Sequence, residues 1–168
     1  RLEMRSNTLI DSTVSDSFSQ SLVFAFNYGS CADPLVSGYR FSNAAASGEF
    51  NPGLHDNDLP TCPLAITYNT AVSPRDINIH DNKFLAINVR GYTSQRLGNR
   101  VLIQRNQVGE DIMVEYVTGY LHVTDNTARA IVISYAQDPA GAASAEASAT
   151  PVSRIVSNNS VTPITPTV

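Results

Sequence analysis

The chain has 168 residues, of which 42% are hydrophobic and only 15% are charged, and its formal net charge is −4. This length is sufficient for one domain with a buried core, and the negative charge argues against direct binding of nucleic acid. No apolar run approaches the roughly 20 residues that a membrane-spanning helix needs. The low share of charged residues is offset by many Ser, Thr, Asn and Ala residues, and this composition is typical of secreted or assembled β proteins.

The first 20 residues are polar and rich in hydroxyl groups. Leu9, Ile10, Val14 and Phe18 fall near the spacing of one helical face. Ser, Thr and Asp stand between them, and these side chains compete with a helix by hydrogen-bonding to the local backbone. We therefore expect residues 1–20 to form an N-terminal arm, either extended or as a short helix.

Residues 21–28 form the first expected strand, which ends at Gly29, and a long irregular loop follows over residues 29–63. The loop contains several Pro and Gly turn signals and both cysteines, Cys31 and Cys62. A disulfide between them would stabilise the domain by roughly 3–4 kcal/mol, but two free thiols are equally consistent with the sequence. A loop of this length is a candidate binding surface, with contact candidates Tyr39, Phe41, Phe50 and His55.

Further strands are expected from alternating apolar and β-branched residues at 64–68, 76–80, 84–90, 100–105, 111–117, 120–124 and 128–136. Asp81 and Asn82 predict a tight hairpin turn. No segment between the strands has the length of a crossover helix, which argues against a parallel sheet, and no internal repeat is visible. The expected fold is therefore all-β: an antiparallel β-sandwich of about eight strands over residues 21–136, with a jelly roll as one specific form.

Residues 137–168 change in character. A low-complexity Ala-rich linker precedes an extended tail with three prolines, which is either a disordered end or an arm docked on a neighbouring subunit. Apolar residues are more frequent than a solvated tail requires. The candidate assembly arm consists of Val152, Ile155, Val156, Val161 and Ile164.

No constellation for catalysis is recognisable, and we expect no enzymatic activity, cofactor or metal site. His55, His80 and His122 show no paired spacing on one element, so a shared metal site is disfavoured. Asp56 and Asp58 could hold Ca²⁺ in a loop, but the EF-hand pattern is absent and an ordinary turn, which explains the same residues, is favoured. No nucleophile elbow or phosphate-binding loop is present.

These observations favour a structural subunit of a repeating assembly, such as a viral capsid or capsid-decoration protein, that acts by self-association in a virion or outside the cell. The expected partners are copies of the chain or other subunits. The alternative is an extracellular binding module of the adhesin, pilin-like or carbohydrate-binding kind, which would present the 29–63 loop.

Overall fold

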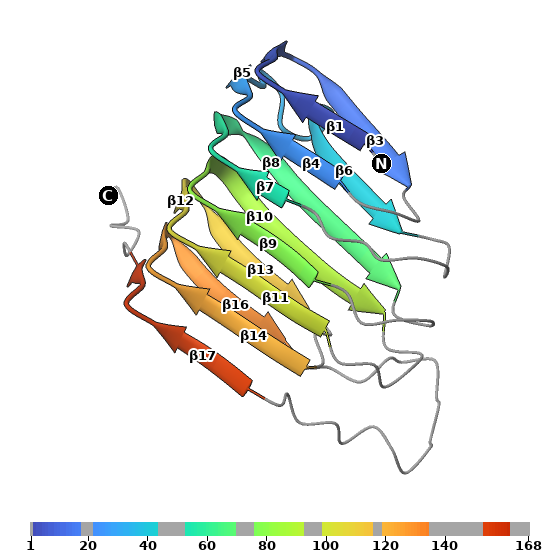
Figure 1. Ribbon diagram of the computed structural model, residues 1–168. Helices are drawn as coiled ribbons and strands as arrows, with labels where there is room; N and C mark the ends of the chain where they lie inside the picture. The colour runs from blue at the N-terminus through green and yellow to red at the C-terminus, as the bar shows by residue number, and fades with distance from the viewer. Residues whose placement is uncertain are drawn as a thin grey trace, which may run out of the picture.

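The chain folds into a parallel β-solenoid. The computed structural model describes residues 2–17, 22–43, 53–69, 76–92, 99–115, 119–134 and 153–161, and it contains no helix in these ranges. All strand pairs are parallel. The chain winds through coils that stack one above another from the first described strand to the last (Figure 1).

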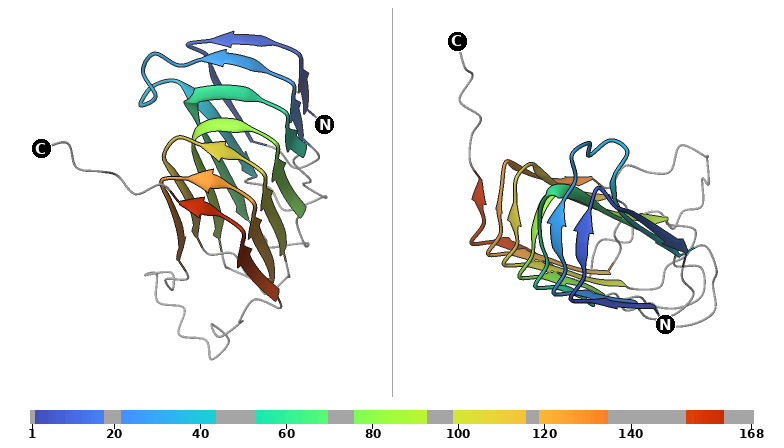
Figure 2. Two further views of the ribbon diagram at one scale, coloured as in Figure 1. Left: turned by 90° about the vertical axis from the view of Figure 1, so that its left-hand side faces the viewer. Right: turned by 90° about the horizontal axis from the view of Figure 1, so that it is seen from above.

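Each coil begins on the same seven-stranded sheet, which we call the first face. It consists of β1 (Leu2–Arg5), β4 (Leu22–Ala25), β7 (Gly53–His55), β9 (Asp76–His80), β11 (Asn99–Gln104), β14 (Gly119–Thr124) and β17 (Ser153–Ser157). Figure 2 shows these strands as one wall of the coil, with the remaining strands forming the rest of its outline.

The other sheet has eleven strands and turns a corner. Its short part holds β2 (Thr8–Ile10), β5 (Tyr28–Ser30), β12 (Gln107–Val108), β15 (Thr127–Ala128) and β18 (Ser160–Val161). Its long part holds β3 (Thr13–Ser17), β6 (Gly38–Asn43), β13 (Asp111–Glu115) and β16 (Ala130–Ser134). The long strands β8 (Asp58–Asn69) and β10 (Lys83–Tyr92) run through both parts and join them.

The predicted antiparallel β-sandwich, with its jelly-roll form, is wrong. Many expected strands exist, and 76–80 is β9, but β9 pairs with β7 and β11 of the adjacent coils rather than with its neighbour in the chain. The turn at Asp81 and Asn82 is not a hairpin, because it directs the chain into the second sheet. Parallel pairing needs no crossover helix here, since the other strands of each coil carry the chain back to its start.

Both predicted arms contribute strands to the solenoid. Residues 1–20 contain β1, β2 and β3, and residues 137–168 contain β17 and β18. The sequence did not reveal that these segments belong to the sheets, because each of these strands pairs with a strand of a different coil, far away in the chain.

The core consists of rows of apolar side chains that stack along the solenoid. Residues in register on successive coils are of similar kind because they occupy equivalent places. The row on the first face is Phe24, Leu54, Ile79, Ile103 and Val123, each with no exposed surface. Two rows on the long part begin with Tyr39 and Phe41 and continue through Ile87 and Val89. A contact within one row therefore joins residues that are far apart in sequence.

An asparagine follows the first-face strand in every coil, and it is buried in all coils but the first and the last. This asparagine ladder consists of Asn7, Asn27, Asn57, Asn82, Asn106, Asn126 and Asn159. The expectation of no internal repeat is therefore wrong. The repeat is hard to see because the intervals between successive members vary from 20 to 33 residues.

Asn82 illustrates how the ladder is bonded. Its Oδ1 accepts hydrogen bonds from the backbone N–H of Asn57 at 3.1 Å and from Asn57 Nδ2 at 2.8 Å. Its own N–H and Nδ2 donate in turn to Asn106 Oδ1, at 3.1 and 2.9 Å. Nδ2 also donates to the carbonyl of Leu54 at 2.9 Å. Each ladder residue thus satisfies polar groups that the turn would otherwise leave buried and unbonded.

The residue before each ladder asparagine has a left-handed backbone. These seven residues are Ser6, Phe26, Asp56, Asp81, Arg105, Asp125 and Asn158, with φ between 53° and 57°. Asp, Asn and Ser tolerate this conformation relatively well, whereas a bulky side chain seldom adopts it. Phe26 is therefore an exception that requires a separate explanation.

Replacing a central ladder residue is expected to be strongly destabilising. Asn82→Ala would leave the Asn57 N–H buried without an acceptor, at a cost of about 1–3 kcal/mol for each unsatisfied group. We expect a total loss near 3 kcal/mol in chemical denaturation. Asn88→Ala is the control, because Asn88 Nδ2 donates only a weak hydrogen bond to Met113 Sδ, at 3.9 Å, among the described residues. Equal losses for the two variants would contradict the role of the ladder.

Gly29 is expected to tolerate no side chain. A Cβ atom built at Gly29 would lie 1.8 Å from the Leu9 carbonyl oxygen of the adjacent coil, and its φ is +154°. Gly29→Ala should therefore lower stability by several kcal/mol, above the roughly 1–3 kcal/mol of ordinary overpacking. At Gly109 the nearest atom to such a Cβ is 3.6 Å away, so Gly109→Ala should have little effect on the melting temperature. Similar melting temperatures for the two variants would show that the backbones can separate.

Candidate functional site

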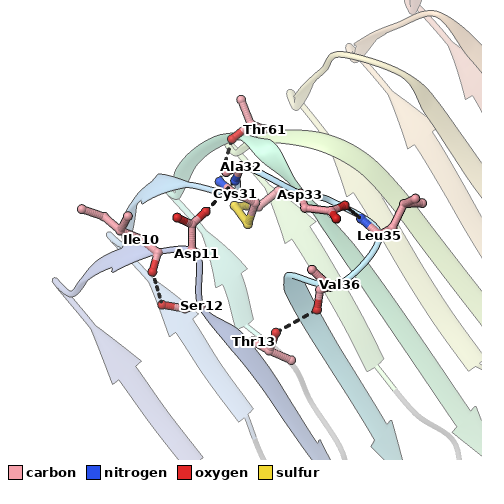
Figure 3. Close-up of a disulfide and its surroundings, with 11 residues drawn as sticks. Ile10, Asp11, Ser12, Thr13, Cys31, Ala32, Asp33, Leu35, Val36 and Thr61 are labelled. Carbon is pink, nitrogen blue, oxygen red and sulfur yellow. Dashed lines mark hydrogen bonds between the residues drawn. A yellow bond between two sulfur atoms is a disulfide. The ribbon is translucent and has the colours of Figure 1, made fainter.

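The two cysteines form a disulfide that joins adjacent coils at one corner of the solenoid (Figure 3). Their Cα atoms are 5.1 Å apart. The Cys31 N–H donates to Thr61 Oγ1 at 2.8 Å, and the Ala32 N–H donates to Asp11 Oδ1 at 2.6 Å. Residues 31–37 project from this anchored corner.

The predicted long loop at 29–63 is about half strand in the structure, since β5, β6, β7 and part of β8 fall within it. Tyr39 and Phe41 are 0% and 1% exposed and pack against Phe24. They are core residues and cannot contact a ligand, so their assignment to a binding surface is wrong. Phe50 lies outside the described residues. His55 is partly exposed and takes part in the cluster described next.

Three rings line up on successive coils at the corner where the first face ends. The rings of His55 and His80 are stacked in parallel, with centroids 5.2 Å apart and planes 5° apart. Phe26 meets His55 edge-on at 5.2 Å. We call Phe26, His55, His80 and the flanking Asp56 and Asp81 the histidine ridge. The two histidine rings are neighbours because the strand register aligns His55 with His80.

Each histidine of the ridge is held by the carboxylate of the next residue. His55 Nδ1 lies 2.7 Å from Asp56 Oδ2, and His80 Nδ1 lies 2.7 Å from Asp81 Oδ2. A carboxylate can only accept a hydrogen bond, so in both rings Nδ1–H is the donor. In the neutral imidazole this leaves Nε2 with a free lone pair. The two rings therefore present equivalent acceptor atoms on adjacent coils.

Arg105 fixes one end of the ridge. Its Nε and Nη2 atoms donate to the Asp81 carboxylate at 2.8 and 2.7 Å. The hydrogen bonds from Arg105 and His80 lower the pKa of Asp81 to about 2, with the Arg105 bond the larger cause. Asp81 is thus ionised throughout the neutral range and keeps the His80 ring oriented.

His122 does not join the other two histidines. Its register partners are Leu102 and Ile155 on the first face. No group of three or more His, Cys, Asp or Glu side chains that could hold a metal ion occurs in the described ranges. Asp56 and Asp58 form separate contacts, Asp56 with His55 and Asp58 with Lys83 at 3.2 Å.

Sequence reasoning considered His55 and His80 but did not bring them together, because 25 positions separate them. One signal was available: the tripeptide His-Asp-Asn occurs at 55–57 and again at 80–82. Two identical tripeptides in equivalent turns place like side chains next to each other once the repeat is known.

In the last described coil, residues are exposed at positions whose counterparts in earlier coils are buried. Val156 continues the row of Phe24 and Val123, yet it is 45% exposed, and Val161 is 50% exposed. A shallow hollow at this end is lined by Ala130, Ile131, Ile133, Val156, Ser157, Asn158, Asn159 and Val161. We call this surface the C-terminal end face. It contains two predicted assembly residues, Val156 and Val161; a third, Ile155, is 43% exposed on β17, and Val152 and Ile164 lie outside the described residues.

The first coil forms the opposite surface, the N-terminal end face. It carries Met4 and Val14, which pack partly against the core, and Leu9, which is 8% exposed. Asn7 donates from its N–H and Nδ2 to Asn27 Oδ1 at 3.1 and 2.9 Å. Its own Oδ1 accepts no hydrogen bond from any described residue.

No protein-family model, no curated protein and no solved structure matches this chain. The described residues include no helix long and apolar enough to cross a membrane.

Phe26 is expected to reduce the stability of the protein. It occupies a left-handed turn position, where Ser, Asp or Asn stands in five of the seven coils, and this conformation costs a bulky residue roughly 1–2 kcal/mol. We expect Phe26→Asn to raise the free energy of unfolding by about 1 kcal/mol, measured by chemical denaturation. Phe26→Ala is the control, because it removes the ring without easing the backbone. Destabilisation by both variants would show that the Phe26 ring contributes more than its backbone costs.

Proposed function

We propose that this chain is a structural subunit that self-associates end to end, so that the solenoid continues from one copy into the next. The observation that carries the proposal is the complementarity of the two end faces. The β-sandwich that suggested a capsid protein is absent, so the proposal concerns self-association alone.

The asparagine ladder has a direction. In each step, the N–H and Nδ2 of one coil donate to the Oδ1 of the coil that follows it in sequence. Among the described residues, the ladder therefore runs from Asn7, whose Oδ1 accepts no hydrogen bond, to Asn159, whose N–H donates none. Stacking the N-terminal end face of one copy on the C-terminal end face of another would join these groups in the bonding pattern that the chain already repeats.

The apolar rows support the same junction. Solenoid repeats bury their apolar faces against neighbouring repeats, and terminal repeats usually have a polar outer surface that keeps the protein soluble. The C-terminal end face instead carries Val156 and Val161, both about half exposed. A second copy would place Met4 and Leu9 against this surface. Strand edges at the two ends would pair in the same step, and an open strand edge favours such pairing.

A junction of this kind is head-to-tail, because one end face contacts the other. Interfaces of this type do not close by two-fold symmetry and give either rings or open filaments. We expect a filament, in which the stack of coils continues from one copy to the next. The Cys31–Cys62 disulfide supports a setting outside the reducing cytosol.

The binding-module alternative receives less support in its original form. Two of its four proposed contact residues are buried in the core, which removes the aromatic surface on which it depended. The exposed remainder near the disulfide is the short projection with Leu35 and Val36, at 86% and 65% exposure.

Light scattering across a concentration series tests the proposal. The unmodified chain should increase in mass with concentration. Val161→Asp should block the C-terminal end face and Met4→Asp the N-terminal end face, so each variant alone should stay monomeric. An equimolar mixture of the two variants should form a dimer, because each retains the face that the other lacks.

Leu102→Asp is the matched control, since Leu102 is a partly exposed apolar residue on β11, a strand that is paired on both edges by β9 and β14. It should associate like the unmodified chain, and circular dichroism should show that all variants keep their β content. A monomeric unmodified chain at every concentration would overturn the proposal. So would a mixture of the two blocked variants that remains monomeric.

A further inference from the structure

We infer that the histidine ridge is a binding site for a divalent transition-metal ion, with the Nε2 atoms of His55 and His80 as its protein ligands. The inference concerns a site on the side of the solenoid and does not depend on end-to-end association.

The first support is the arrangement of the donors. The two rings stand on adjacent strands in register, parallel and with centroids 5.2 Å apart. Both Nδ1 atoms are occupied by carboxylates, which leaves two equivalent Nε2 lone pairs side by side. Nε2 must come within about 2.0–2.1 Å of a zinc-like ion, so the outer edges of the rings have to tilt towards each other. Side-chain rotation can provide this tilt, because the His55 and His80 side chains are 23% and 26% exposed.

The second support is the pair of carboxylates that hydrogen-bond to the Nδ1 atoms of the rings. Histidines that bind metals commonly donate their other ring N–H to a carboxylate, which fixes the tautomer and makes the ligand nitrogen more basic. Asp56 and Asp81 already occupy these places, at 2.7 Å in each pair. On one side Phe26 shields His55 with the edge of its ring. The two carboxylates therefore fix the tautomer that leaves both Nε2 atoms free, and ion binding requires only the tilt of the rings.

The third support is an oxygen without a partner. Asn78 precedes His80 by two residues, so strand alternation places both side chains on the same face. Asn78 Oδ1 is buried and has no hydrogen-bond partner. The residue in register with Asn78 on the neighbouring strand is Gly53, which has no side chain and precedes His55 by two residues. This unpartnered oxygen lies on the same face as the two imidazoles, and a water held by a bound ion could supply its missing hydrogen bond.

The donors select the class of ion. Imidazole nitrogen favours Cu²⁺, Ni²⁺ and Zn²⁺ over Mg²⁺ or Ca²⁺, and the Irving–Williams order places Cu²⁺ first for a given site. The local charge also favours a cation, since Asp56 and Asp81 hydrogen-bond to the two rings and Arg105 pairs with only one of these carboxylates, Asp81. Two protein nitrogens would occupy neighbouring positions of a tetragonal Cu²⁺ ion, with water in the remaining ones.

Titration of the folded chain with CuCl₂, followed by calorimetry and electron paramagnetic resonance, tests the inference. We expect one Cu²⁺ per chain in the tightest class of sites, with a spectrum that shows two coordinated imidazole nitrogens. His55→Gln and His80→Gln should each weaken this binding at least tenfold and leave a single-nitrogen spectrum. Asp56→Asn should weaken it about tenfold through the orientation of His55.

His122→Gln is the matched control, because it removes a histidine from the same face of the solenoid but not from the ridge. It should change the affinity by less than twofold. Circular dichroism should show that the variants keep their β content. A single-nitrogen spectrum for the unmodified chain, or an equal loss of affinity in His122→Gln and His80→Gln, would overturn the inference.

Discussion

The fold depends on the hydrogen bonds that each ladder asparagine forms with the next coil. The turn that leads from the first face to the second sheet buries backbone groups, and a buried N–H without an acceptor is costly. The acceptor comes from the next coil rather than from the same one, because the backbone N–H and Nδ2 of Asn57 donate to Asn82 Oδ1. No coil can therefore complete its own turn, and the stability of each depends on its neighbour, as in other repeat proteins.

The asparagine ladder also determines how side chains are arranged on the outer surface. Because the ladder fixes the register, outward-facing residues of equivalent turns form continuous rows along the solenoid. His55 and His80 meet in this way, and so do Asp58 and Lys83, whose side chains are 3.2 Å apart. The inward rows leave little choice of residue, since Leu54 and Ile79 are fully buried. Residue identity is less constrained at the turn, where Phe26 and Arg105 depart from the usual Ser, Asp or Asn despite the left-handed backbone.

The sequence predicted strands better than it predicted their arrangement. Alternation at 76–80 and 111–115 is a local property, and both segments are strands. The direction of pairing is not local: a turn such as Asp81–Asn82 resembles a hairpin turn in composition, and hairpin turns also use left-handed φ values such as its 57°. The buried Asn82 side chain, bonded to Asn57 and Asn106 of the adjacent coils, distinguishes it. Irregular intervals between the asparagines hid the repeat. Tyr39 and Phe41 resembled loop aromatics because Pro and Gly surround their strand, although they stack on strand β8 of the next coil.

The direction of the ladder links the two proposed activities without making one depend on the other. A head-to-tail junction would preserve the sense of every hydrogen bond, so all copies in a filament would point the same way. The histidine ridge lies at the turn, and the rows that meet at the end faces run through Val156 and Leu9. One ridge would then recur in every copy, at a spacing set by the length of the solenoid. Metal binding at the ridge would leave the junction free, and blocking an end face would leave the ridge intact.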